Sequence, residues 1–355
     1  MRRFLWLFLP TVFLIARAAG DAPAVDVAAG WLRLFDGETA FGWSIDGEAR
    51  VVGGVLVLGG TRTTTAVSPS LGGGEVQLRY RIEGKEAPMM SLGAGAARPA
   101  DDARGERQRF RLDNRKAAPI AKWTIPAGTQ VHVTELAFRP TLTQSLLDGK
   151  TLTGWKSFTG DPKREKSTFT LADGVLTVKN GPGDLATETL FDDFVLQLQC
   201  RSNGKFLNSG IFFRAIPGQY QNGYEAQIQH DFSLPMPKSY PVDVYDQATG
   251  KATGKREVLS RARDFGTGAI YRRIPARSAQ AKDGEWFTMT VVARGRHLTT
   301  WVNGVQQVDW TDHRPPHDNP RNGYREKAGA ISIQGHDPTT DLSFKEFRIS
   351  PLERN

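Results

Sequence analysis

Residues 34–43 read LFDGETAFGW and residues 146–155 read LLDGKTLTGW, so one pattern, L-x-D-G-x-T-x-x-G-W, occurs twice without a gap. The far ends of the two copies also correspond, because ELAFR at 135–139 resembles KEFRI at 345–349. A chain that opens and closes twice in the same way indicates a duplicated domain.

The repeat predicts one domain over 28–141 and a second, longer one over 142–355. In the second copy, short segments of alternating or apolar residues predict strands at 194–201, 209–215, 224–229, 287–293, 298–302 and 330–334. Asn303-Gly304 is typical of a hairpin turn. No segment keeps a helical period over three turns. We therefore predict an all-β chain of two β-sandwich or jelly-roll domains in tandem, the first shorter and degenerate.

The first residues predict export. Two arginines precede an apolar run from Phe4 to Ile15, and Ala16-Arg17-Ala18 follows, which is the order of a signal peptide over residues 1–18. The apolar run is too short to span a bilayer, and no later segment approaches that length. We therefore expect a periplasmic or secreted protein, cleaved near Ala18, without a membrane span.

Charge and cysteine content exclude several classes of function. The formal net charge is +8, but the basic residues are dispersed, so we do not expect nucleic-acid binding. Cys200 is the only cysteine, and it alternates with polar neighbours on the apolar face of the segment 194–201. We therefore expect Cys200 to be a core residue rather than a catalytic thiol.

Polar residues gather in three segments that only the second copy contains, at 208–214 (NSGIFFR), 223–231 (GYEAQIQHD) and 334–337 (QGHD). In a strand with period two, the second segment places a carboxylate and two amides on one face. These side chains are Glu225, Gln227 and Gln229. Such a face supplies the paired donors and acceptors that sugar hydroxyls require. The alternative is an ordinary solvated sheet face.

Two further features leave alternatives open. The six histidines show no zinc-like spacing, so no cofactor is assigned, although His230 and Asp231 beside Glu225 keep a divalent metal ion open. The segment 256–277 carries six arginines. It either clamps an anionic glycan or forms a solvated basic loop.

In their order along the chain, these motifs together with TGAIY at 267–271, WVNG at 301–304 and GAISIQGH at 329–336 resemble the bacterial 3-keto-disaccharide hydrolase family. The resemblance covers about 142 to 351 and is weaker for the first copy. It implies a concanavalin A-like jelly roll, export, and action on sugars whose C3 hydroxyl has been oxidised to a ketone.

A C3 ketone acidifies the C2 proton, so a base can remove it and the enolate can expel the glycosidic oxygen, after which water adds. For this reaction we expect Glu225 or His336 as base and Arg214 as stabiliser of the enolate oxygen. The expected substrate-binding residues are Asn208, Gln227, Gln229, Tyr271 and Gln334. A separate sugar 3-oxidoreductase would supply the ketone. The alternatives are a lectin-like glycan-binding module without turnover and a structural cell-surface protein.

Overall fold

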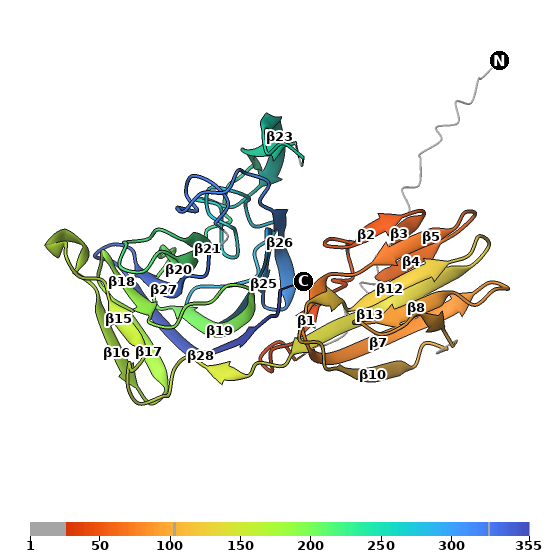
Figure 1. The fold of residues 1–355 in the computed structure, drawn as a ribbon, viewed down its shortest axis with the longest axis horizontal. Helices are drawn as coiled ribbons and strands as arrows, with labels where there is room; N and C mark the ends of the chain where they lie inside the picture. Colours follow the sequence, from red (N-terminus) through yellow and green to blue (C-terminus); the bar gives the residue numbers. More distant parts are fainter. Residues whose placement is uncertain (1–25, 102–103, 247, 326, 355) are drawn as a thin grey trace, which may run out of the picture.

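The computed structural model describes residues 26–101, 104–246, 248–325 and 327–354, and its regular structure is almost entirely β (Figure 1). The one helical element in these residues is a 3-10 turn, η1 (Pro162–Arg164). The prediction of an all-β chain is confirmed. Residues 1–18, the predicted signal peptide, lie outside the described part. No helix in the described ranges is long and apolar enough to cross a membrane.

The first half of the chain contributes thirteen described strands. They are β1 (Leu32–Arg33), β2 (Ser44–Asp46), β3 (Ala49–Val52), β4 (Val55–Gly59), β5 (Thr64–Val67), β6 (Ser70–Leu71), β7 (Gly74–Glu83), β8 (Met89–Leu92), β9 (Arg98–Pro99), β10 (Arg107–Leu112), β11 (Ala118–Pro119), β12 (Ala121–Ile125) and β13 (Gln130–Pro140). The predicted boundary between the copies falls between the end of β13 and the next strand.

The second half contributes the remaining described strands. They are β14 (Gln144–Ser145), β15 (Trp155–Ser157), β16 (Thr168–Ala172), β17 (Val175–Lys179), β18 (Gly183–Thr187), β19 (Phe194–Ser202), β20 (Ser209–Ala215), β21 (Tyr224–Ile228), β22 (Lys238–Tyr245), β23 (Ala252–Ser260), β24 (Phe287–Arg294), β25 (His297–Val302), β26 (Val305–Thr311), β27 (Ala330–Gly335) and β28 (Asp341–Pro351). The β22–β23 hairpin projects from the body (Figure 1).

One large sheet runs through both halves. Its strand order is β10-β7-β13-β1-β26-β25-β24-β19-β28-β17-β16. β1 joins the two parts, because it pairs antiparallel with β13, Leu32 opposite Phe138, and parallel with β26 at Arg33 and Val305. Smaller sheets pack against each part of the large one, so each half is a two-layer sandwich.

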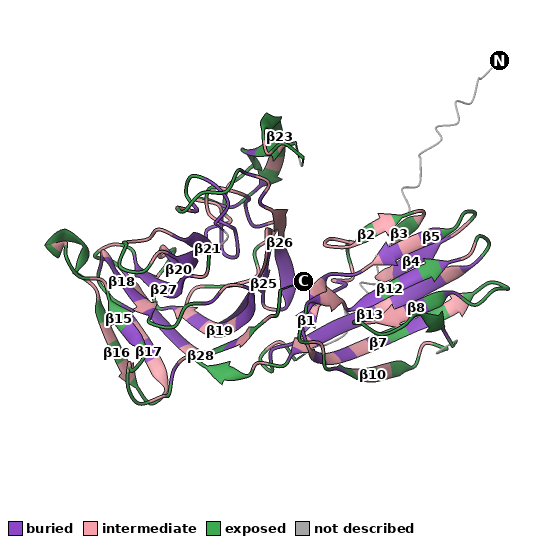
Figure 2. Ribbon diagram, in the orientation of Figure 1, coloured by how far each residue is buried: buried purple, intermediate pink, exposed green. Residues whose placement is uncertain are grey.

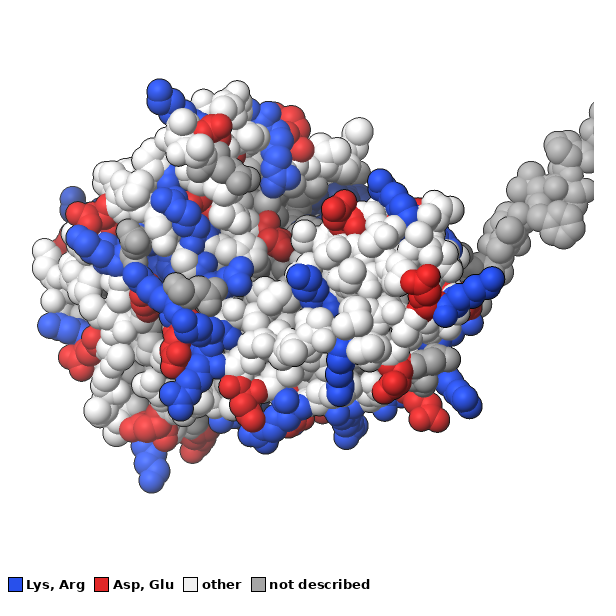
Figure 3. All heavy atoms as spheres, turned by 45° about the vertical axis from the view of Figure 1, so that its right-hand side comes forward, with Lys and Arg blue, Asp and Glu red and all other residues white. Residues whose placement is uncertain are grey.

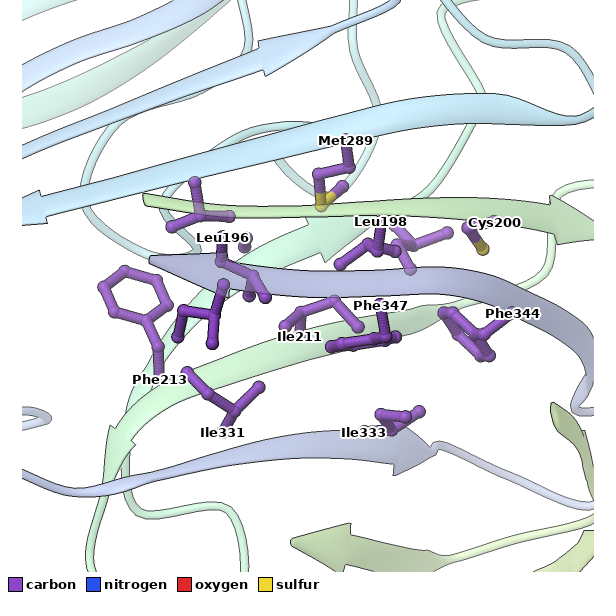
Figure 4. Packing of buried hydrophobic residues seen from close by; sticks show 14 of the residues in the cluster. Leu196, Leu198, Cys200, Ile211, Phe213, Met289, Ile331, Ile333, Phe344 and Phe347 are labelled. Atoms are coloured by element: carbon purple, nitrogen blue, oxygen red, sulfur yellow. The ribbon is translucent and has the colours of Figure 1, made fainter. Parts of the chain in front are cut away.

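Each half has a hydrophobic core (Figure 2). Tyr80 and Trp123 centre the first, with ring centroids 4.9 Å apart. In the second, Phe213 and Phe347 lie between the sheets, and Cys200 is fully buried among hydrophobic side chains, Phe344 included (Figure 4). The prediction that Cys200 belongs to the core is confirmed. Fully burying one such large side chain contributes roughly 1.5–3 kcal/mol.

The repeated motif folds in the same way in both copies. Asp36 accepts a hydrogen bond from the Thr39 backbone N–H at 2.7 Å, and Asp148 accepts one from Thr151 at the same distance. The indole N–H of each motif tryptophan donates back to the backbone carbonyl of the motif's first leucine, at 2.6 Å in both copies. The turn and the tryptophan anchor therefore explain why these residues recur.

Contacts between the halves include close polar ones. Arg277 of the second half forms an ion pair with Asp36 and donates to Thr39 Oγ1 at 3.0 Å. Gln197 Nε2 donates to the Gly30 carbonyl at 3.1 Å. A Cβ on Gly30 would lie 2.3 Å from the Gln197 oxygen, and its φ of +84° also favours glycine. On the face shown in Figure 3, basic and acidic side chains are interspersed.

Candidate functional site

The site lies on the outer face of the five-stranded sheet β15-β18-β27-β20-β21. The inner face packs Leu185, Ile211, Ala226 and Ile333 into the core of the second half. Because side chains alternate across a strand, the neighbouring positions face outward. Register places Asp184 opposite Gln334 and Gly210 opposite Gln227 on that outer face. The sheet therefore presents a row of polar groups above an apolar core.

A cavity of about 280 Å³ opens on this face. Its lining residues are Asn208, Phe212, Gln221, Gly223, Tyr224, Glu225, Ile270, Tyr271, Arg272, Arg273, Pro320, Arg321, Gln334 and His336. Five of the residues expected from the sequence are among them: Asn208, Glu225, Tyr271, Gln334 and His336. The structure thus brings together residues from four separate motifs.

Glu225 is the buried carboxyl of this cavity. Its side chain is 8% exposed, and it forms no ion pair with another described residue. Burial raises the pKa of Glu225 to about 8, against the opposing effect of the Arg321 guanidinium. The carboxyl lies over Gly210, since a Cβ at that position would approach Glu225 Oε1 to 2.6 Å. Glu225 is therefore mostly protonated at neutral pH, and it is a stronger base than an ordinary glutamate once ionised.

Amide side chains surround Glu225 and leave acceptors free. Asn208 Nδ2 and Gln227 Nε2 both donate to Asp264 Oδ2, at 2.7 and 3.2 Å. The side-chain oxygens of Gln227 and Gln334 are buried without a hydrogen-bond partner among the described residues. Leaving such an acceptor unpaired costs about 1–3 kcal/mol. A ligand hydroxyl that donates to the Gln334 oxygen would recover that energy. Gln227, expected from the sequence to bind substrate, does not line the cavity.

Three arginines face this cavity as well: Arg272, Arg273 and Arg321. None forms an ion pair with a described residue; Arg321 Nε donates to the Gln221 carbonyl at 3.0 Å and Arg273 to the Arg321 carbonyl at 2.6 Å. The Arg272 guanidinium lies 5.3 Å from the Tyr271 ring centroid, and burial raises the pKa of the Tyr271 hydroxyl. Part of the arginine-rich segment is therefore cavity wall rather than solvated loop.

Arg214 does not line this cavity, which corrects its expected role at the enolate oxygen. Its side chain is fully buried, 2.7 Å from Asp193, and it also donates to the carbonyls of Asp192 and Gly295. The cause is a bulge in β20 between Phe212 and Ala215, where Arg214 has a φ of +46°. The extra residue reverses the alternation and turns Arg214 away from the face that carries Phe212.

Gln229 also lies away from the cavity, because β21 ends at Ile228. Its amide donates to the Phe206 carbonyl at 3.1 Å and accepts from the Asp231 backbone at 3.0 Å. Gln229 therefore fixes the chain beyond the strand instead of contacting a ligand in the cavity. The expected alternation of side chains between the two sheet faces therefore ends with β21, one residue before Gln229.

The open metal candidates have separate partners. His230 Nδ1 lies 2.7 Å from Thr267 Oγ1, and burial lowers the pKa of His230 to about 4, so the ring is neutral at pH 7. Asp231 pairs with Arg263 at 2.8 Å. In the described residues, no group of three or more His, Cys, Asp or Glu side chains could hold a metal ion.

Two further titratable groups lie in or next to the cavity: His336 in its lining, and Asp184 beside Gln334 in the sheet. His336 lies at the cavity rim, just past the end of β27, with Nδ1 2.8 Å from Asp337 Oδ2. Sequence patterns did not identify Asp184, which is 5% exposed and accepts from the Gln221 backbone N–H at 2.9 Å. Burial raises the pKa of Asp184 to about 7. Asp184 is recognised only from the strand register of the structure, which places it beside Gln334.

Solved structures with some likeness to the chain include carbohydrate-related proteins. A candidate glycosyl hydrolase from Parabacteroides distasonis is 22% identical, with a TM-score of 0.42, over 59% of this chain and 93% of that one. The carbohydrate-binding module CBM66 from Bacillus subtilis is 12% identical, with a TM-score of 0.34, over 56% and 95%. With identities and TM-scores this low, the likenesses carry no argument about function. Comparison with curated proteins found no similar sequence.

The family comparison is more informative. The 3-keto-alpha-glucoside-1,2-lyase-like domain matches residues 143–350, which include every residue of the cavity. This match supports a carbohydrate-active function. Because it spans more than half of the chain, the protein belongs to the family of the 3-keto-alpha-glucoside-1,2-lyase-like domain.

Proposed function

We propose that the protein cleaves glycosides whose sugar carries a ketone at C3, with Glu225 as the base. The observation that carries this proposal is a buried carboxyl with a pKa of about 8 in a cavity whose wall contains three arginines that form no ion pair with another described residue. A strongly perturbed carboxyl next to fixed cations is typical of a site for proton transfer. The family description supports the 3-keto substrate class.

The reaction needs no oxocarbenium-like transition state. The ionised Glu225 takes the C2 proton, and the C2–H electron pair forms the enolate of the C3 ketone. The enolate then expels the glycosidic oxygen from C1, leaving an enone, and the leaving oxygen takes up a proton. Water adds to C1 and a proton returns to C2, so the products are a 3-keto sugar and the free aglycone alcohol. Ordinary glycosidases use two carboxyls at a sugar that is not oxidised.

The cavity residues fit the other requirements. Arg272 and Arg321, whose charges act on Glu225, take the role at the enolate oxygen that Arg214 cannot fill. The free oxygen of Gln334 accepts a hydrogen bond from a sugar hydroxyl, whereas Gln227 does not line the cavity and supports it only from below. Since no nucleotide signature is evident in the sequence, we also propose that a separate sugar 3-oxidoreductase supplies the ketone and that the protein acts after export.

The test compares glucosides with their 3-keto counterparts and measures release of the aglycone. We expect turnover of the keto form only, and at least a hundredfold loss in kcat with Glu225→Gln. Glu285→Gln, a carboxyl outside the cavity, is the matched control and should keep full activity. If Glu225→Gln retains activity while His336→Ala loses it, His336 is the base.

A glycan-binding module without turnover is the second candidate, because unpaired buried acceptors serve binding and catalysis equally. Binding of sugars without release of any aglycone, across glucosides and 3-keto-glucosides, would favour it. In that case Glu225→Gln should bind as well as the unmodified protein.

A further inference from the structure

A second cavity of about 250 Å³ lies on the same sheet face. It adjoins the first along β27, where Gln334 lines the first cavity and Ser332 lines the second. Residues two apart on one strand face the same side, roughly 7 Å apart. Across the sheet, Phe212 of the first cavity pairs with Ser332, and Asp184 of the second pairs with Gln334. The two cavities therefore share one floor.

The lining of the second cavity is mainly apolar, in contrast to the arginine wall of the first. Its floor contains Ala186, Ala215 and Ala330, which pack with Phe212. Because these side chains are small, they leave room for a ligand above the sheet. Leu190 lies in the wall with 45% of its side chain exposed. Ser332 is 3% exposed, and its hydroxyl has no hydrogen-bond partner in the part of the chain that the structure describes. The site thus combines exposed apolar surface with a free hydroxyl near the first cavity.

One loop, residues 216–223, passes between the cavities. Its first part, 216–219, lines the second cavity, and Gln221 lines the first. Gln221 is held from both sides, because its N–H donates to Asp184 and its carbonyl accepts from Arg321. The division between the cavities is therefore a fixed part of the structure.

We propose that the second cavity binds the aglycone of the glycoside and selects an apolar alkyl or aromatic group. The inference rests on the proposed function, which places the oxidised sugar against Glu225 in the first cavity. The bond that breaks joins the sugar to its aglycone, so the aglycone must lie within one sugar ring of Glu225. The second cavity adjoins the first, and its floor of small apolar side chains favours hydrocarbon, while the charged residues of its lining are Lys156, Asp184 and Glu188.

The test uses 3-keto-glucosides with methyl, propyl and hexyl aglycones, whose leaving groups differ little in acidity. We expect kcat/KM to rise about tenfold or more from methyl to hexyl, because each buried methylene adds binding. Leu190→Asp places a charge in the wall and should reduce the hexyl to methyl ratio at least fivefold. Leu259→Asp, on the exposed hairpin, is the matched control and should leave the ratio unchanged. A ratio near one, or one that Leu190→Asp does not change, overturns the proposal.

A binding measurement separates failure of this inference from failure of the proposed function. Hexyl and methyl glucosides with an intact C3 hydroxyl are titrated calorimetrically into the unmodified protein, Leu190→Asp and Ala186→Phe, which fills the floor. Tighter binding of the hexyl compound, lost in both variants, supports the aglycone site even if no 3-keto-glucoside is cleaved. Equal binding of both compounds, or none, overturns it, provided that thermal melts show both variants folded.

Discussion

The Glu225 carboxyl experiences two opposing effects at the residue scale. Burial raises its pKa to about 8, Arg321 and Arg272 act to lower it, and Asp264 acts to raise it. As a base, Glu225 must be ionised, so we expect kcat/KM to increase with pH and to level off above about pH 8. Asp264→Asn removes a negative charge, which should lower the pKa of Glu225 and so move the rising part of the pH profile to lower pH. If the rising part of the measured pH profile stays in place or moves to higher pH in this variant, Glu225 is not the base.

The same carboxyl makes stability depend on pH. Its ordinary pKa is 4.5, and the folded value is about 8, so the folded protein keeps a proton that the unfolded chain releases between these values. The stability that this group provides is present below pH 4.5 and is lost as the pH rises towards 8. Glu225→Gln avoids that loss, which is worth about 1.4 kcal/mol per pKa unit. Urea unfolding at pH 5 and pH 8.5 should show the variant gaining on the unmodified protein only at the higher pH.

A variant that changes the free energy of unfolding equally at both pH values would show that Glu225 is not buried as an acid. Asp184→Asn offers a parallel measurement, because burial raises the pKa of Asp184 to about 7. The gain in free energy of unfolding from Asp184→Asn should be complete by about pH 7, about one pH unit lower than the gain from Glu225→Gln.

At the scale of single elements, the bulge in β20 gives Arg214 a structural role instead of a catalytic one. Arg214 and Asp193 form a buried ion pair, and breaking such a pair from one side typically costs about 3–5 kcal/mol. We expect Arg214→Met to destabilise the protein by this amount, and Arg214→Met with Asp193→Asn to recover part of it, as measured by urea unfolding. Full stability with lost aglycone release would return Arg214 to a catalytic role.

Strand positions were largely predictable, because local alternation determines them. The predicted segment 209–215 coincides with β20, and 330–334 differs from β27 by one residue. The hairpin β22–β23 was not predicted, since most of its residues are exposed and only Tyr240 and Val242 of β22 form a short buried face. The sheet face on which a side chain lies was predictable only where strand pairing is regular. Glu225 faces the cavity as expected. Arg214 lies at a bulge and Gln229 lies beyond the end of β21, so the expected face was wrong for both.

At the scale of the whole molecule, the duplicated motif predicted two similar units but not the sheet they share. The pairing of β1 with β26 rests on one residue pair, Arg33 and Val305, and has no signature in either copy. Arg321 and Asp184 were missed for a similar reason, because Arg321 lies in a distant loop and Asp184 in β18, and they come near Glu225 only in the folded chain.

Because the halves share a sheet, the second half should not be stable alone. Val195, Val292 and Trp301 belong to the second half but are buried in the core of the first, each 3% exposed or less. A chain that begins at residue 142 would expose them together with the edge of β26, which invites aggregation. We expect this fragment to be insoluble or oligomeric by light scattering, and Val195→Thr with Val292→Thr to improve its solubility. A monomeric fragment with the melting temperature and activity of the full chain would show that the first half is an independent appendage.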